Sequence, residues 1–82
     1  MPMCNEMTNY EMRKNFGSNL HKERINHNLT IEDLAEALDV STQAIHKWQK
    51  GVSYPEPPKM LKLSKMFDTS IEQLLTGNAY ER

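Results

Sequence analysis

The segment DVSTQAIHKWQKG, residues 39–51, holds four polar side chains that can exchange hydrogen bonds with a partner outside the chain: Thr42, Gln43, His46 and Lys47. The amide of Gln43 can donate and accept at once, which matches the N6 and N7 edge of adenine, whereas Lys47 suits the O6 and N7 acceptors of guanine. Thr42 adds a hydroxyl and a methyl group that can contact thymine. If Ile45 and Trp48 face inward, the helical period gathers all four polar residues on the opposite face. The pattern predicts a helix that reads base edges in the major groove of DNA.

A second set of polar groups flanks this segment and suits the phosphates of a DNA backbone. The N-terminus of a helix presents free N–H groups, which favour anions. Hydroxyl and ammonium groups add to them, and the residues expected to contact phosphate in this way are Thr30, Ser41, Lys50, Ser53 and Tyr54. The two sets together predict a site that combines base recognition with attraction to the backbone.

Five helices are needed to position these residues, and each is predicted from apolar spacing and from signals at its ends. The expected segments are 16–27, 30–38, 42–50, a fourth that begins at Pro57 or Pro58 and carries Phe67, and 70–76. Ser41 is the expected cap of the third helix, and Gly51 is its expected stop. No segment alternates with period two, so the predicted fold class is all-α.

These helices are expected to form one compact domain, residues 16–77, between a flexible N-terminal arm, residues 1–15, and a short C-terminal tail, residues 78–82. The residues predicted to face inward are Phe16, Leu20, Ile25, Ile31, Leu34, Ala35, Leu38, Ala44, Ile45, Trp48, Met60, Leu61, Leu63, Ser64, Phe67, Ile71, Leu74 and Leu75. A chain of 82 residues buries only a modest core.

The charge is unevenly distributed along the chain. The formal net charge is -1, which is not typical of a nucleic-acid binder. Residues 32–39 contain four acidic side chains and no Lys or Arg, whereas residues 41–65 contain five lysines against Glu56 alone. One end of the fold is therefore expected to be basic although the whole chain is slightly acidic.

The long segment from NLTIEDLAEALDVS through QAIHKW, Gly51 and Pro55 to the final LL resembles the Cro/repressor-type helix-turn-helix family, also called the xenobiotic-response-element (XRE) family. The resemblance implies a compact five-helix domain of the lambda-repressor-like DNA-binding type. It also implies that the third helix reads double-stranded DNA, usually as a symmetric dimer on a pseudo-palindromic operator. By this match Thr42, Gln43 and Lys47 fall at base-reading positions, and His46 falls at a groove-facing position.

Three residues depart from the family pattern. The first helix has Glu23 at a position where a hydrophobic residue is common. Many members carry Gln at the first position of the second helix, where this chain has Ile31. Many also carry Glu near the end of the recognition helix, paired with an Arg of the first helix. Here Arg24 is present but the partner position holds Gln49, so a charge-assisted hydrogen bond replaces the salt bridge and Arg24 is freer to reach a phosphate.

The function predicted from these features is sequence-specific DNA binding by a cytoplasmic, repressor-like transcriptional regulator. A homodimer is expected, with the fifth helix and the TGNAYER tail as its interface. The alternative is a protein-interaction module of the same fold, such as an antitoxin that masks a toxin. The acidic second helix and the net charge favour that alternative, and antitoxins of this fold often repress their own promoters, so the two roles are compatible.

Other function classes find no support in the sequence. There is no nucleophile beside a base, no carboxylate pair suited to a cleft and no phosphate-cradling glycine loop, so no enzyme and no cofactor are predicted. Cys4, His21 and His27 lack the paired spacing of a zinc site, so no metal is predicted. No long apolar run suggests a membrane span, and the single cysteine suits a reducing compartment.

Overall fold

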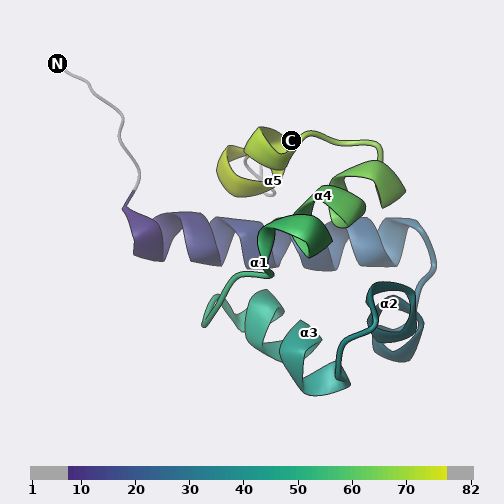
Figure 1. Ribbon diagram of the computed structural model, residues 1–82. Helices are drawn as coiled ribbons and strands as arrows, with labels where there is room; N and C mark the ends of the chain where they lie inside the picture. The colour runs from purple at the N-terminus through teal and green to yellow at the C-terminus, as the bar shows by residue number, and fades with distance from the viewer. Residues whose placement is uncertain (1–7, 78–82) are drawn as a thin grey trace, which may run out of the picture.

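The computed structural model describes residues 8–77 and contains five helices in that range (Figure 1). They are α1 (Asn9–Asn26), α2 (Ile31–Leu38), α3 (Thr42–Lys50), α4 (Pro57–Met66) and α5 (Ile71–Thr76). Within residues 8–77 there is no β-strand, which confirms the all-α class. The helix-turn-helix pair, α2 and α3, lies below α1 in Figure 1, and α5 lies above it.

The start of α1 differs from the sequence prediction. The helix begins at Asn9, seven residues before Phe16, so the predicted flexible arm is wrong for residues 9–15. The cause is a capping box: the Thr8 hydroxyl accepts a hydrogen bond from the Glu11 backbone N–H at 3.0 Å, and the Glu11 carboxylate accepts one from the Thr8 N–H at 3.0 Å. The remainder of the predicted arm, residues 1–7, and the tail, residues 78–82, lie outside the described residues.

The other helices begin and end close to the predicted residues. Thr30, Ser41 and Ser70 are the N-caps of α2, α3 and α5, and each side-chain oxygen accepts a backbone N–H three residues later. Pro57 occupies the first position of α4, where a missing N–H has no consequence.

The core lies between α1 and the other helices. Its buried members are Phe16, Leu20, Leu34, Ala35, Leu38, Ile45, Trp48, Met60, Leu63, Phe67 and Leu74, all of which were predicted to face inward. Two other predictions are wrong, because Ile25 is 51% exposed and Leu61 is 50% exposed. At about 100° per residue, Ile25 lies about 140° around α1 from Leu20, and Leu61 lies about 160° around α4 from Leu63.

α1 organises the fold by packing against both α3 and α5. The buried Asn19 side chain donates through Nδ2 to the carbonyl oxygens of Leu74 and Gly77, both at 2.9 Å. Asn15 donates in the same way to the Leu75 oxygen at 2.9 Å. These amides satisfy the carbonyls that the C-terminus of a helix leaves without partners, so they fix the end of α5 against α1.

Candidate nucleic-acid interface

The turn between α2 and α3 is set by local hydrogen bonds. Asp39 adopts a left-handed conformation with φ 58°, which ends α2. The Val40 N–H then donates to the Ala35 oxygen at 3.0 Å, and the Ser41 hydroxyl accepts the Ala44 N–H at 3.2 Å. The turn is therefore three residues long, as a helix-turn-helix unit requires.

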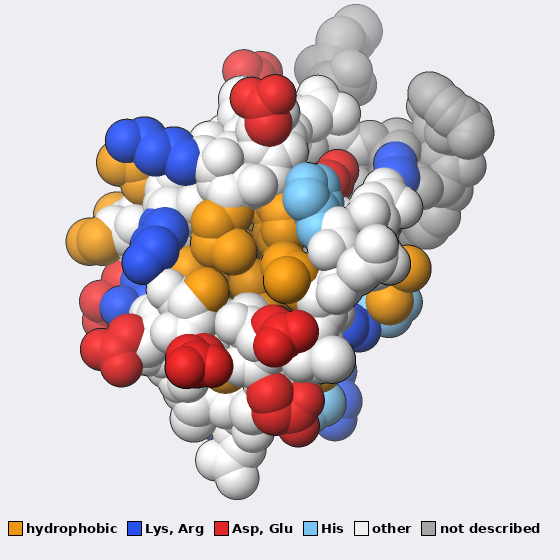
Figure 2. Space-filling model, turned by 90° about the vertical axis from the view of Figure 1, so that its right-hand side faces the viewer, with side chains coloured by type: hydrophobic (Ala, Val, Ile, Leu, Met, Phe, Trp, Pro, Cys, Tyr) orange, Lys and Arg blue, Asp and Glu red, His pale blue; other side chains and the backbone are white. Residues whose placement is uncertain are grey.

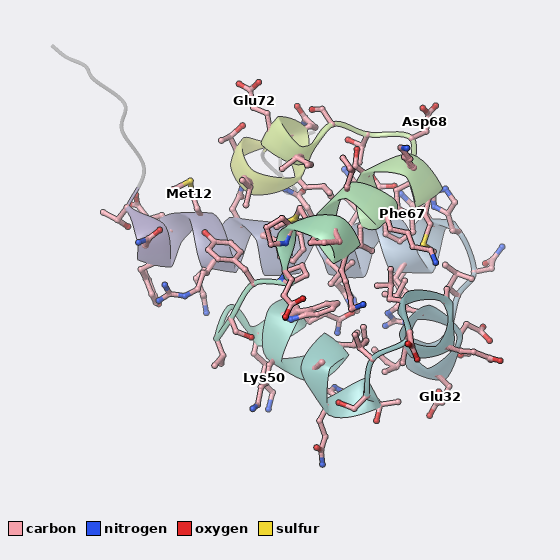
Figure 3. All side chains as sticks on the ribbon, viewed as in Figure 1. Met12, Glu32, Lys50, Phe67, Asp68 and Glu72 are labelled. Carbon is pink, nitrogen blue, oxygen red and sulfur yellow. The ribbon has the colours of Figure 1, made fainter. Side chains whose placement is uncertain are left out.

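The two faces of α3 divide as the sequence predicted. Ile45 and Trp48 are buried in the core, at 0% and 5% exposure. The predicted DNA-contacting side chains lie on the other side: Gln43, His46, Lys47 and Lys50 are exposed, and Thr42 is half-buried. Figure 3 shows Lys50 extending away from the body of the molecule. The four exposed side chains form no hydrogen bond within residues 8–77, so they are available to an external partner.

The C-terminal end of α3 is held by α1. Gly51 ends the helix in the left-handed conformation, with φ 79°. The Arg13 Nε–H donates to the Gly51 oxygen at 3.1 Å. The sequence prediction missed this contact because it placed Arg13 in a flexible arm, and the T-x-x-E spacing of Thr8 and Glu11 is the signal that extends the helix to include it.

Arg24 forms the predicted hydrogen bond with Gln49, from Nε to Oε1 at 3.1 Å. Its Nη1 also donates to the Leu29 oxygen at 2.7 Å, which joins the end of α1 to the loop before α2. Arg24 is half-buried and thus braces α3 and this loop. Its contact with a phosphate stays a prediction, and any such contact uses the guanidinium N–H groups that remain.

The remaining phosphate candidates lie outside α3, at two helix N-termini and in the loop that follows α3. Thr30 and Ser41 are exposed at the N-termini of α2 and α3 and serve as caps. Ser53 and Tyr54 are half-buried in the loop between α3 and α4. The Tyr54 ring packs edge-on against Phe16, with the ring centroids 6.1 Å apart, so the ring has a structural role.

An acidic surface lies next to these groups. The four acids of residues 32–39, Glu32, Asp33, Glu36 and Asp39, are all exposed. Figure 2 shows acidic side chains gathered over the lower part of the face that includes α2. Hydrogen bonds from the Thr30 backbone N–H, and then from its side chain, hold the pKa of Asp33 below its ordinary value of 3.8, so this carboxylate keeps its charge near neutral pH.

Two further observations concern metals and membranes. Within residues 8–77, no three His, Cys, Asp or Glu side chains are grouped closely enough to hold a metal ion. Cys4, which belongs to the zinc set considered above, lies outside these residues. None of the helices of this range combines the length and the apolar character needed to span a membrane.

The fold and the outward face of α3 define an all-α helix-turn-helix domain of the lambda-repressor-like type. A family model described as helix-turn-helix matches residues 20–74, and the chain belongs to this family. It is similar to the HTH-type transcriptional activator BcrR of Enterococcus faecalis, with 44% identity over 62 residues, which cover 76% of this chain and 30% of the activator.

Two other relatives are HTH-type transcriptional regulators. One is YqaE of Bacillus subtilis, 28% identical over 67 residues, which cover 82% of this chain and 58% of YqaE. The other is from Methanocaldococcus jannaschii, 44% identical over 48 residues, which cover 58% of this chain and 73% of that protein. The chain thus spans less than a third of BcrR and somewhat more than half of YqaE.

Proposed function

We propose that this protein is a sequence-specific DNA-binding regulator of transcription that places α3 in the major groove. The observation that carries the proposal is the outer face of α3, where Gln43 and Lys47 are exposed opposite the buried Ile45 and Trp48. The relatives named as HTH-type transcriptional regulators support it. One of them is named as an activator, so the proposal covers regulation in either direction, although the sequence alone favoured a repressor.

In this proposal three side chains of α3 each contact a different part of the DNA. Gln43 pairs with the N6 and N7 edge of adenine, and Lys47 with the O6 and N7 edge of guanine. Residues four apart lie one above the other along a helix, so these two side chains reach neighbouring base pairs. Thr42, at the first position of α3, contacts thymine or the backbone beside it.

The test is a binding titration with Gln43→Ala and Lys47→Ala on a duplex selected from random DNA. Each lost base contact is expected to cost about 1–3 kcal/mol and to relax the preference at one base pair. Lys62→Ala, on the exposed side of α4, is the matched control and should leave the preference unchanged. Unchanged affinity and preference in both α3 variants would remove this face from the reading of DNA.

We further propose that two copies bind together on a pseudo-palindromic site, with the α3 helices about 34 Å apart in successive major grooves. An apolar groove of about 400 Å³ supports α5 as part of the interface, since Ile71 and Leu75 of this helix line it together with Met12 and Met60. Ile71→Glu is expected to give a monomer in analytical ultracentrifugation and to weaken operator binding. A monomeric wild-type protein at micromolar concentration would refute the dimer.

A second candidate function is protein binding through α2, as in an antitoxin. The exposed acids of α2, together with Asp39 at its C-cap, favour it, because this surface repels a DNA backbone and attracts a basic partner. Salt dependence separates the two candidates. DNA binding through phosphate contacts falls steeply between about 50 mM and 200 mM salt, whereas a module that binds only protein shows no DNA binding at either salt concentration.

A further inference from the structure

A cleft of about 350 Å³ lies between α1 and α3, at the side of the proposed reading face. Its lining residues are Gly17, Ser18, His21, His46, Gln49 and Lys50. Ser18 and His21 come from α1, and no role in DNA binding was predicted for either residue.

Glycine at position 17 brings the two helices together beside this cleft. A Cβ atom at Gly17 would lie 2.5 Å from the Gln49 carbonyl oxygen and 2.6 Å from that of Trp48, so the backbones are in direct contact. The longer side chains on either side of this contact form the walls of the cleft. The cleft is therefore a consequence of the α1–α3 packing and has a fixed position relative to α3.

The chemistry of the lining favours an anion. No carboxylate is among the lining residues, whereas Lys50 carries a positive charge and Ser18 offers a hydroxyl donor. The Gln49 Oε1 already accepts from Arg24 at 3.1 Å, so its amide N–H groups are the part left to donate. His21 and His46 can donate when neutral and add positive charge when protonated. An oxyanion such as a phosphate suits this set of donors.

The position of the cleft indicates which phosphate it takes. His46 and Lys50 are exposed on the same side of α3 as Gln43 and Lys47, so a duplex that meets the reading face also meets the rim of the cleft. We propose that the α1–α3 cleft holds a backbone phosphate of the bound DNA, with Ser18 and His21 extending the contact from α3 to α1. This inference rests on the proposed function, and it changes the role of His46 from a base contact to a phosphate contact.

The ionisable groups that line the cleft are His21 from α1 and His46 and Lys50 from α3. His21 is the one that lies outside α3, so its replacement tests whether the phosphate contact extends to α1.

The experiment compares His21→Gln and His21→Lys with the full wild-type chain by fluorescence anisotropy. The probes are a duplex selected from random DNA and an unselected duplex of equal length, in the same buffer. His21→Gln should weaken binding to both probes by a similar factor, about threefold to tenfold, because a phosphate contact is independent of sequence. His21→Lys keeps a cationic donor at this position and should therefore restore binding to both probes.

Lys22→Gln is the matched control, since Lys22 is exposed on the same helix and does not line the cleft. If the wild type binds DNA and the His21→Gln variant binds with the same affinity, the phosphate site is overturned and the proposed function stays intact. A loss confined to the selected duplex also overturns it, because that result indicates base reading. Failure of the wild type to bind either duplex overturns the proposed function, and this inference with it.

Discussion

Replacement of Gly17 by alanine should destabilise the protein, although the same change stabilises most helices. Gly17 lies within α1, where alanine normally gains about 1 kcal/mol over glycine. The added Cβ atom would lie 2.5 Å from the Gln49 oxygen and 2.6 Å from the Trp48 oxygen, whereas real contacts of this kind are essentially never shorter than 3.0 Å. Both oxygens belong to the backbone, so α3 must move as a whole.

The size of the effect follows from two opposing terms. An extra methyl group in a well-packed interface costs about 1–3 kcal/mol. Movement of α3 also disturbs Ile45 and Trp48, which are buried at 0% and 5% exposure, and each contributes about 2 kcal/mol or more through burial. The added methyl group, less the helix gain of about 1 kcal/mol, leaves a loss of up to about 2 kcal/mol. The disturbed burial of Ile45 and Trp48 adds to it, so the free energy of unfolding is expected to fall by at least about 1 kcal/mol.

Urea denaturation followed by circular dichroism measures this loss directly. Ser18→Ala is the control, since it changes the neighbouring residue of α1 without adding an atom at the backbone contact, and it should alter stability by no more than about 0.5 kcal/mol. DNA affinity should also fall in Gly17→Ala, because the displaced α3 carries the side chains proposed to read bases. A variant at least as stable as the wild type would refute the reasoning about close approach.

Three further predictions concern a buried amide and two acids. Asn19→Ala removes the donor to the Leu74 and Gly77 oxygens and should lower the free energy of unfolding by about 2 kcal/mol, measured by urea denaturation. An unchanged urea midpoint would show that these two hydrogen bonds do not stabilise the fold. Because the pKa of Asp33 is lower in the folded state than its ordinary 3.8, its charge stabilises the fold above that pH and ceases to do so as the pH falls through the folded value. Asp33→Asn should therefore show a smaller loss of stability on acidification, measured as the urea midpoint at about pH 5 and about pH 3, and an identical loss would count against the capping box as its source. Glu32→Gln removes a repulsion between the carboxylate and the DNA phosphates, so it should raise DNA affinity about twofold at about 50 mM salt. At about 200 mM salt the effect should be small, because salt screens this repulsion; equal effects at both concentrations would exclude an electrostatic cause.

The helix-turn-helix pair was predictable because its signals are local. The caps Thr30 and Ser41, the left-handed Gly51 and the spacing of Ile45 and Trp48 each act within a few residues, and all of them are found as expected. The contacts that fix this pair to α1 join residues far apart in the chain, and apolar spacing carries no information on them.

The contacts that were missed are long-range and polar. Arg13 reaches Gly51 across 38 residues, and Asn19 reaches Leu74 across 55. The cleft between α1 and α3 was not predicted for the same reason. The packing of Gly17 against Gln49 depends on how the two helices cross, and the order of residues within either helix does not reveal it. The predictions for Ile25 and Leu61 are wrong for a simpler reason: an apolar side chain is not always buried, and both lie on the solvent side of their helices.

The exposed side chains on the outer face of α3 form no hydrogen bond within residues 8–77, while its inner face is held by Ile45, Trp48 and the capped ends. Substitutions at Gln43 or Lys47 are thus almost free of consequences for folding. Under the proposed function, one or two codon changes at these positions alter the preferred operator and leave the scaffold unchanged.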